Sequence, residues 1–224
     1  MKSTSLLKRS IILFSILVLP SLAYLFLRTG KNNFKHLAIF GPRDVAVNGK
    51  DTVYHQVPPF SFINQDGKVI TDKDFDGKIY VANFFFATCK GICPKMSIQM
   101  GRVVKKFKDN KEVLLLSHTV NPEHDSVSVL AEYAKFYNAD SKKWAFVTGD
   151  KKEIYDIARN GYFITALKGD GGPDDFIHDE KLILIDKEKH IRGYYDGTSV
   201  NDVSRLLDEI KVLLGQYKEK ESQQ

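Results

Sequence analysis

The chain of 224 residues is 43% hydrophobic and 27% charged, which suffices for one well-packed domain with an appendage and is too short for two ordinary domains. Its formal net charge of +5 includes four basic residues among the first 28 positions, where no acidic residue occurs, so the remainder carries only +1. A nearly neutral domain without a basic aromatic motif gives no support to nucleic-acid binding.

An uncharged apolar stretch covers residues 10–27 and follows the basic pair Lys8-Arg9. The pattern predicts a single transmembrane anchor with residues 1–9 in the cytoplasm, and it places the protein in the cell inner membrane with its C-terminal domain in the periplasm or an equivalent exported space. A cleaved signal peptide is the alternative, although no clean small-x-small cleavage site precedes Arg28. Under either interpretation the rest of the chain is exported.

A domain predicted over residues 51–216 follows a tether over 28–50, which contains several glycines and at most one short strand. Asp66-Gly67 separates two extended runs and predicts an N-terminal β-hairpin. The apolar, β-branched and aromatic run over 78–86 is typical of a buried central strand.

The rest of the domain alternates between helical and strand periodicity. A helix over 201–217 with Asn201 as its N-cap comes last, and residues 217–224 are expected to be a disordered tail. This order predicts an α/β, thioredoxin-like three-layer sandwich with an N-terminal β-hairpin, preceded by a single transmembrane helix. The other predicted helices cover 94–108, 126–137 and 151–160, and the other predicted strands cover 112–118, 144–147, 181–186 and 191–195.

Two cysteines flank a three-residue loop where the buried strand leads into a helix, in the run Cys89-Lys90-Gly91-Ile92-Cys93-Pro94. Pro94 suits the first helical position, so Cys93 lies at or next to a helix N-terminus, where free N–H groups favour a thiolate. A structural disulfide is the alternative, but closing so short a loop gains little entropy. The pair therefore indicates thiol or metal chemistry in an oxidising compartment.

The C-x-x-x-C spacing favours metal binding over rapid thiol exchange, because the extra residue widens the loop between the sulfurs. Thiolates select Cu(I) and zinc, and an added histidine also suits Cu(II). In a thioredoxin-like sheet, the loop that enters the strand at Lys181 returns beside the cysteine loop, and this favours His178 as the third ligand. It follows a glycine-rich segment over 168–173. His118 and His124, near a strand end at the same edge, are the rival ligand source and by default solvated loop residues.

At this point the sequence resembles the Sco/SenC copper chaperones of cytochrome oxidase assembly, over residues 55–215. The resemblance rests on the cysteine motif, on His178 ahead of the strand at Lys181, and on three further runs. These are FFFATC at 84–89, NPEHD at 121–125 and WAFVTGD at 144–150. Departures include His118, Asn121 and Lys90, where many members have an apolar residue, an aspartate and a proline, respectively.

The resemblance implies a membrane-tethered thioredoxin domain in which Cys89, Cys93 and His178 bind copper. We therefore expect a membrane-anchored chaperone that receives copper, as Cu(I) or Cu(II), from an upstream donor and delivers it to the dinuclear copper centre of a terminal oxidase subunit. The alternative to a non-enzymatic metallochaperone is a thiol-disulfide reductase, which uses the same two cysteines as a redox pair. Against it, Ile177 and His178 stand where thioredoxins keep a cis-proline. A peroxidase needs an arginine beside the active cysteine, and none lies close in sequence to Cys89.

Overall fold

The computed structural model describes residues 8, 12–22, 24, 37–45, 51–164 and 179–223. The chain forms two compact units, Met1–Lys35 and His36–Gln224. In the first unit residues 12–22 are helical, and large hydrophobic side chains such as Leu13 and Phe14 are exposed. None of the helices among the described residues combines the length and the hydropathy that crossing a bilayer requires.

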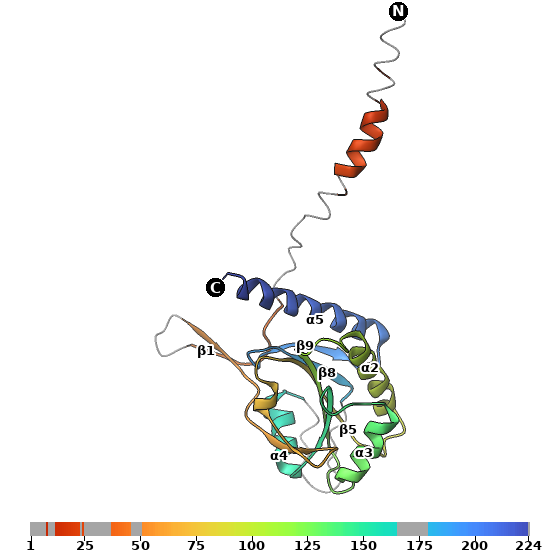
Figure 1. The fold of residues 1–224 in the computed structure, drawn as a ribbon. Helices are drawn as coiled ribbons and strands as arrows, with labels where there is room; N and C mark the ends of the chain where they lie inside the picture. The colour runs from red at the N-terminus through yellow and green to blue at the C-terminus, as the bar shows by residue number, and fades with distance from the viewer. Residues whose placement is uncertain are drawn as a thin grey trace, which may run out of the picture. The chain divides into compact units, whose positions relative to one another are not determined.

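A seven-stranded mixed sheet forms the centre of the second unit (Figure 1). Its strands are β3 (Ser61–Asn64), β4 (Val69–Thr71), β5 (Ile79–Phe85), β6 (Val113–Thr119), β7 (Trp144–Thr148), β8 (Lys181–Ile185) and β9 (Ile191–Asp196). They are ordered β4-β3-β7-β6-β5-β8-β9. Strands β5, β6 and β7 run parallel, whereas β8 pairs antiparallel with β5. The mixed sheet and its helices confirm the expected α/β thioredoxin-like fold.

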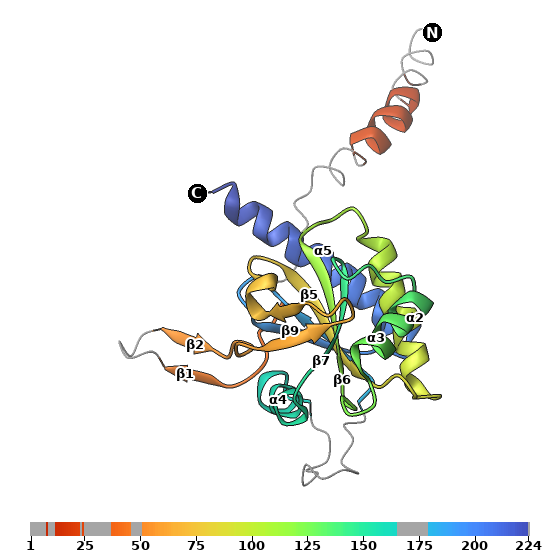
Figure 2. The ribbon, with the colours of Figure 1, turned by 60° about the horizontal axis from the view of Figure 1, so that its bottom comes forward.

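Helices cover both faces of this sheet (Figure 2). On one face, α2 (Ile92–Lys106), α3 (Val127–Phe136) and α5 (Val200–Glu221) bury their apolar sides in one core cluster. On the other face, α4 (Lys151–Asp156) and the π-helical turn Ile157–Gly161 share a second cluster with aromatic side chains that precede and form β3. The predicted helix over 151–160 is thus present but changes its hydrogen-bond pattern halfway.

Strand β5 is buried at every position, as its unbroken apolar sequence predicts for a strand covered on both faces. The N-terminal hairpin is also present, with β3 and β4 pairing from Ser61↔Thr71 to Ile63↔Val69. Gly67 has a φ of +73° in its turn, a conformation that glycine adopts without a Cβ penalty.

Part of the predicted tether lies against the domain. The Phe40 N–H donates to the carbonyl of Ile191 at 2.9 Å, and the guanidinium of Arg192 donates to the carbonyls of Leu37 and Ala38. After this contact, β1 (Arg43–Val45) and β2 (Thr52–Tyr54) form a separate two-stranded sheet. These pairings depend on partners far away in the chain, which local periodicity does not reveal.

Helix α5 differs from its prediction at both ends. Its N-cap is Ser199 rather than Asn201, and the Ser199 hydroxyl accepts a hydrogen bond from the Asp202 N–H at 3.3 Å. Its C-terminal end continues through Glu221, so the expectation of a disordered tail from residue 217 is wrong for the described residues. Ion pairs of Lys187 with Glu221 and of Lys220 with Glu188 hold this last part of the helix to the β8–β9 turn.

His118 is completely buried in β6, contrary to the expectation of a solvated loop residue. Its ring stacks on Phe84 at a centroid distance of 4.9 Å and meets the edges or faces of Phe62 and Tyr162. Neither ring nitrogen has a hydrogen-bond partner among the described residues. Burial lowers the pKa of His118 to about 3, although the backbone of Asn83 acts in the opposite direction, so the ring is neutral.

We expect His118 to weaken the fold in acid. Its folded pKa of about 3 lies below the unfolded value of 6.5, so protons bind the unfolded chain preferentially and stability is lost as pH falls from 6.5 towards 3. Each pH unit in this window costs up to about 1.4 kcal/mol. His118→Phe should therefore gain about 2 kcal/mol relative to the native chain between pH 7 and pH 5, measured by urea unfolding of the reduced protein.

His118→Leu is the matched second variant, because it removes the titrating ring but packs differently. Both variants should show the same pH-dependent gain even where their free energies of unfolding differ at pH 7. A difference from the native chain that does not change with pH would contradict this account of His118.

Candidate metal and thiol site

The cysteine loop begins where β5 ends. After Phe85 the chain turns, with the Cys89 N–H donating to the carbonyl of Phe86 at 3.2 Å, and α2 starts at Ile92. Cys93 is thus the second residue of the helix, and Pro94 is the third rather than the first as predicted. Proline is tolerated there because N–H groups in the first turn have no intrahelical acceptor. The expected position of Cys93 at a helix N-terminus is confirmed.

Both cysteines are free thiols, but their surroundings differ. Cys93 is 3% exposed and packs with α2 in the core, whereas Cys89 is half-buried at its margin. Burial and the adjacent Cys89 raise the pKa of Cys93 to about 12. Burial also acts to raise the pKa of Cys89, but hydrogen bonds from the Cys93 thiol and from backbone N–H groups of residues 91–93 outweigh it and hold this pKa below its usual value. Cys89 is therefore the thiol that ionises more readily, and Cys93 is its hydrogen-bond donor.

A buried carboxylate ties this loop to the end of β6. Asp125 is 0% exposed, and its Oδ2 accepts hydrogen bonds from the Ala87 N–H at 2.9 Å and from the Thr119 hydroxyl at 2.5 Å. Ala87 lies two residues before Cys89, so the carboxylate fixes the backbone that leads into the cysteines. Sequence reasoning missed this role for Asp125, although an aspartate soon after a buried strand was the available signal.

The rival ligand pair is not brought to the cysteines. The His118 ring packs among the aromatic side chains on the α4 face of the sheet, whereas Cys93 packs on the α2 face. His124 is half-exposed, and its Nδ1 lies 3.2 Å from Oδ1 of Asp125. No group of His, Cys, Asp or Glu side chains among the described residues joins either histidine to the two cysteines in a metal site, so this alternative is not supported.

The predicted third ligand, His178, lies outside the described residues, as do Ile177 and the glycine-rich segment over 168–173. Within the described ranges, no three His, Cys, Asp or Glu side chains are placed to hold a metal ion. The strand that follows residue 178 is described. Strand β8 pairs antiparallel with β5, with Ala82 opposite Ile183, so the N-terminal end of β8 lies at the edge where β5 ends.

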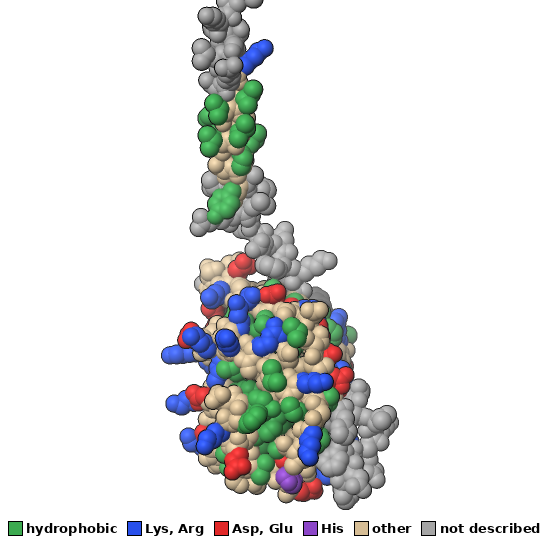
Figure 3. Space-filling view, turned by 90° about the vertical axis from the view of Figure 1, so that its right-hand side faces the viewer, with side chains coloured by type: hydrophobic (Ala, Val, Ile, Leu, Met, Phe, Trp, Pro, Cys, Tyr) green, Lys and Arg blue, Asp and Glu red, His purple; other side chains and the backbone are tan. Residues whose placement is uncertain are grey.

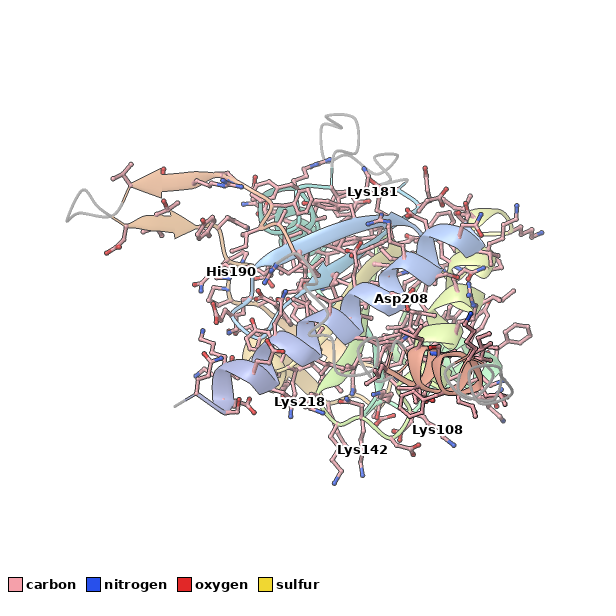
Figure 4. The ribbon with its side chains drawn as sticks, turned by 90° about the horizontal axis from the view of Figure 1, so that it is seen from above. Lys108, Lys142, Lys181, His190, Asp208 and Lys218 are labelled. Atoms are coloured by element: carbon pink, nitrogen blue, oxygen red, sulfur yellow. The ribbon has the colours of Figure 1, made fainter. Side chains whose placement is uncertain are left out.

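Two other histidines lie elsewhere. His55 hydrogen-bonds the carbonyl of Gly161 at 2.8 Å and packs on Phe163. His190 is at the turn between β8 and β9, and Figure 4 shows it at the opposite end of β8 from Lys181. Of the described histidines, His190 is therefore also separated from the edge that carries the cysteine loop.

The fold and the site define a class of protein: a thioredoxin-like domain with a C-x-x-x-C dithiol at the N-terminus of the helix that follows its central strand. The SCO1/SenC family model matches residues 48–215, more than half of the chain. The chain therefore belongs to the SCO1/SenC family. The SCO1 protein homolog of Bacillus subtilis is 31% identical over 164 residues, which cover 72% of this chain and 84% of that protein.

Solved structures agree with this assignment. The structure of BsSco, a member of the Sco family of cytochrome c oxidase assembly proteins in which a disulfide switch was identified, is 30% identical, with a TM-score of 0.60 and coverage of 70% of this chain and 92% of its own. The structure of Arabidopsis thaliana ScoI with copper bound is also 30% identical, with a TM-score of 0.58 and coverage of 71% and 98%. Sco proteins similar to this chain thus include one that binds copper and one with a disulfide switch.

We expect Asp125→Ala to destabilise the domain and loosen the cysteine loop. The substitution leaves the Ala87 N–H and the Thr119 hydroxyl without their acceptor, and we expect a cost of about 2–4 kcal/mol in the free energy of unfolding. Urea unfolding measures the cost, and amide hydrogen exchange of residues 86–90 measures the loosening.

Asp125→Asn is the control, because its amide oxygen still accepts both hydrogen bonds and it should lose clearly less stability. If Asp125→Ala left the exchange of the Ala87 amide unchanged, the carboxylate would not be what positions the loop.

Proposed function

We propose that this chain is a copper chaperone that delivers copper to the dinuclear copper centre of a terminal cytochrome oxidase during its assembly. The observation that carries the proposal is the pair of free thiols, Cys89 and Cys93, hydrogen-bonded to each other within one turn of chain. The assignment to the Sco family supports it, since the similar Arabidopsis protein binds copper and BsSco belongs to a family of oxidase assembly proteins.

The donor set fits Cu(I). Thiolate sulfurs are soft ligands and prefer this ion to hard cations such as magnesium. The half-buried Cys89 already has a lowered pKa, and a metal that replaces the shared proton would allow Cys93 to bind as a thiolate too. The core packing around Cys93 keeps one sulfur fixed, while Cys89 lies at the margin where a partner's ligand can approach.

We assign the third ligand to His178. The support is topological: β8 begins three residues after His178, and its antiparallel pairing with β5 brings that end of the strand to the edge where the cysteine loop starts. An imidazole added to two thiolates gives a site that suits both Cu(I) and Cu(II). Copper then passes to the receiving subunit by exchange of these ligands for those of the partner.

We further propose that residues 10–27 anchor the protein in the cell inner membrane as a single-pass segment, with the copper-binding domain in the periplasm or an equivalent exported space. The uncharged sequence behind Lys8-Arg9 supports this topology, as do the helix and the exposed apolar side chains over residues 12–22. The anchor keeps the chaperone in the membrane that holds its oxidase partner.

A thiol-disulfide reductase is the second candidate, and the difference between the two thiols favours it. An accessible Cys89 with a lowered pKa is suited to attack a disulfide, and a buried Cys93 is suited to resolve the mixed disulfide. The substrate would be the cysteine pair of the oxidase subunit, which has to be reduced before it binds metal.

Anaerobic Cu(I) titration of the full chain in detergent micelles tests the proposed function. The native protein should bind one copper ion with sulfur-to-metal charge-transfer absorption. Cys89→Ser, Cys93→Ser and His178→Ala should each weaken binding by at least about tenfold, equivalent to about 1.4 kcal/mol for a lost ligand.

His124→Ala is the matched control, and it should bind copper as the native chain does. Equal affinity of His178→Ala and the native chain would refute the third ligand. Micromolar or weaker affinity of the native chain, together with a strongly reducing dithiol potential, would favour the reductase instead.

A further inference from the structure

The face of the domain formed by α2 and α3 exposes large apolar side chains. Ile98 on α2 is 60% exposed and Phe136 on α3 is 78% exposed, and Figure 3 shows hydrophobic side chains gathered on this face with charged side chains of both signs around them. Neither side chain is needed in the core, since both project away from it. Contiguous apolar patches on this scale mark interaction sites in soluble domains.

Contacts between the helices make this a continuous surface. The Tyr133 hydroxyl and Ser97 Oγ are 2.9 Å apart and join α3 to α2. Tyr133 packs on Tyr137 at a ring distance of 4.9 Å, and Tyr137 packs on Phe136 at 5.0 Å. We call the surface made by Ile92, Ile98, Tyr133, Phe136 and Tyr137 the α2–α3 surface.

This surface adjoins the thiol site. Cys93 is in the first turn of α2, and Tyr133 is close enough to Cys93 for that thiol to act on the pKa of its hydroxyl. The half-buried Cys89 and Ile92 pack against the same core cluster. Ile92 lies three residues after Cys89, so a protein that covers the Ile92 end of the α2–α3 surface lies beside the cysteine loop.

Basic residues dominate the α2 side of this surface, whereas α3 contributes both Glu132 and Lys135. Helix α2 contains Lys95, Arg102, Lys105 and Lys106 and no acidic residue, and Lys90 precedes it. Lys95 and Lys105 are exposed and form no ion pair among the residues that the structure describes. An apolar centre with unpaired lysines on its α2 side complements a partner with an apolar centre and carboxylates on the side that faces α2.

We infer that the α2–α3 surface is the docking site for the copper-receiving oxidase subunit, and that this subunit presents an apolar patch with carboxylates on the side that faces α2. The inference rests on the proposed function, because transfer by ligand exchange requires the acceptor's ligands to come within bonding distance of a metal held by Cys89. The apolar side chains supply affinity, and the lysines accelerate and orient the encounter.

The test is Cu(I) transfer from the copper-loaded full chain, in detergent micelles, to two acceptors: the soluble copper-binding domain of the oxidase subunit and a small-molecule Cu(I) chelator. The double variant Ile98→Glu with Phe136→Glu should slow transfer to the protein at least about tenfold, as for loss of an interface hot spot. Transfer to the chelator should not change, because the chelator needs no docking surface. Val69→Glu, at a site that is 63% exposed on the edge strand β4, is the matched control.

A second experiment tests how the lysines contribute to docking. Lys95→Glu with Lys105→Glu should slow transfer to the protein and remove most of its salt dependence between about 0.05 and 0.5 M ionic strength, whereas Lys142→Glu, at an exposed position of the β6–β7 connection, should do neither. Slower copper transfer from the native chain at higher ionic strength supports an acidic partner.

The outcomes separate this inference from the function on which it rests. If the native chain binds no copper, the proposed function fails. If it binds copper and the double variant transfers to the protein acceptor at the native rate, the docking site is wrong and the function stands. Loss of self-association in sedimentation without slower transfer would assign the surface to contact with a second copy and overturn the inference.

Discussion

Strand β5 is the constraint on which the rest of this structure depends. It is buried on both faces and paired along its length, parallel to β6 and antiparallel to β8. Core packing fixes the position of β5. The chain therefore leaves the C-terminal end of this strand at a fixed place, and the cysteine loop forms there. The same pairings bring the end of β6 and the start of β8 to this edge, so three segments that are far apart in sequence end or begin at the edge that carries the cysteine loop. Asp125 then joins two of these segments by accepting the Ala87 N–H.

The two thiols have unequal roles because the loop crosses from the surface into the core between them. Cys93, packed in the first turn of α2, is the fixed sulfur, and burial raises its pKa. Cys89 has the lowered pKa and faces the margin of the domain. For a metal chaperone this combination provides a rigid ligand and an approachable one. For a reductase it provides a resolving thiol and an attacking one, which explains how closely related proteins can be associated with copper and with a disulfide switch.

Much of the fold is predictable from local pattern, because strands and helices that bury one or both faces carry that pattern in their own residues. The continuous apolar run of β5, the hairpin at Gly67 and the position of Cys93 at a helix N-terminus are examples. The predictions that were wrong concern residues whose structure depends on partners far away in the chain. The burial of His118 follows from aromatic side chains on other elements, and the extension of α5 follows from ion pairs with the β8–β9 turn.

The candidate site was predictable to the extent that its residues are adjacent in sequence. The C-x-x-x-C spacing and the buried strand before it identify the cysteine pair in the sequence. The structural role of Asp125, in contrast, depends on a contact across 38 residues. The third ligand, His178, stays a prediction supported by the topology of β8. Among the described residues, neither rival histidine forms a metal-binding group with the two cysteines.

X-ray absorption at the copper K-edge of the Cu(I)-loaded full chain tests the central claim most directly, because it counts the atoms bound to the metal. The account predicts two sulfur neighbours from Cys89 and Cys93 and one nitrogen neighbour that disappears in His178→Ala. A copper ion bound by a single sulfur, or by nitrogen and oxygen atoms alone, would contradict it.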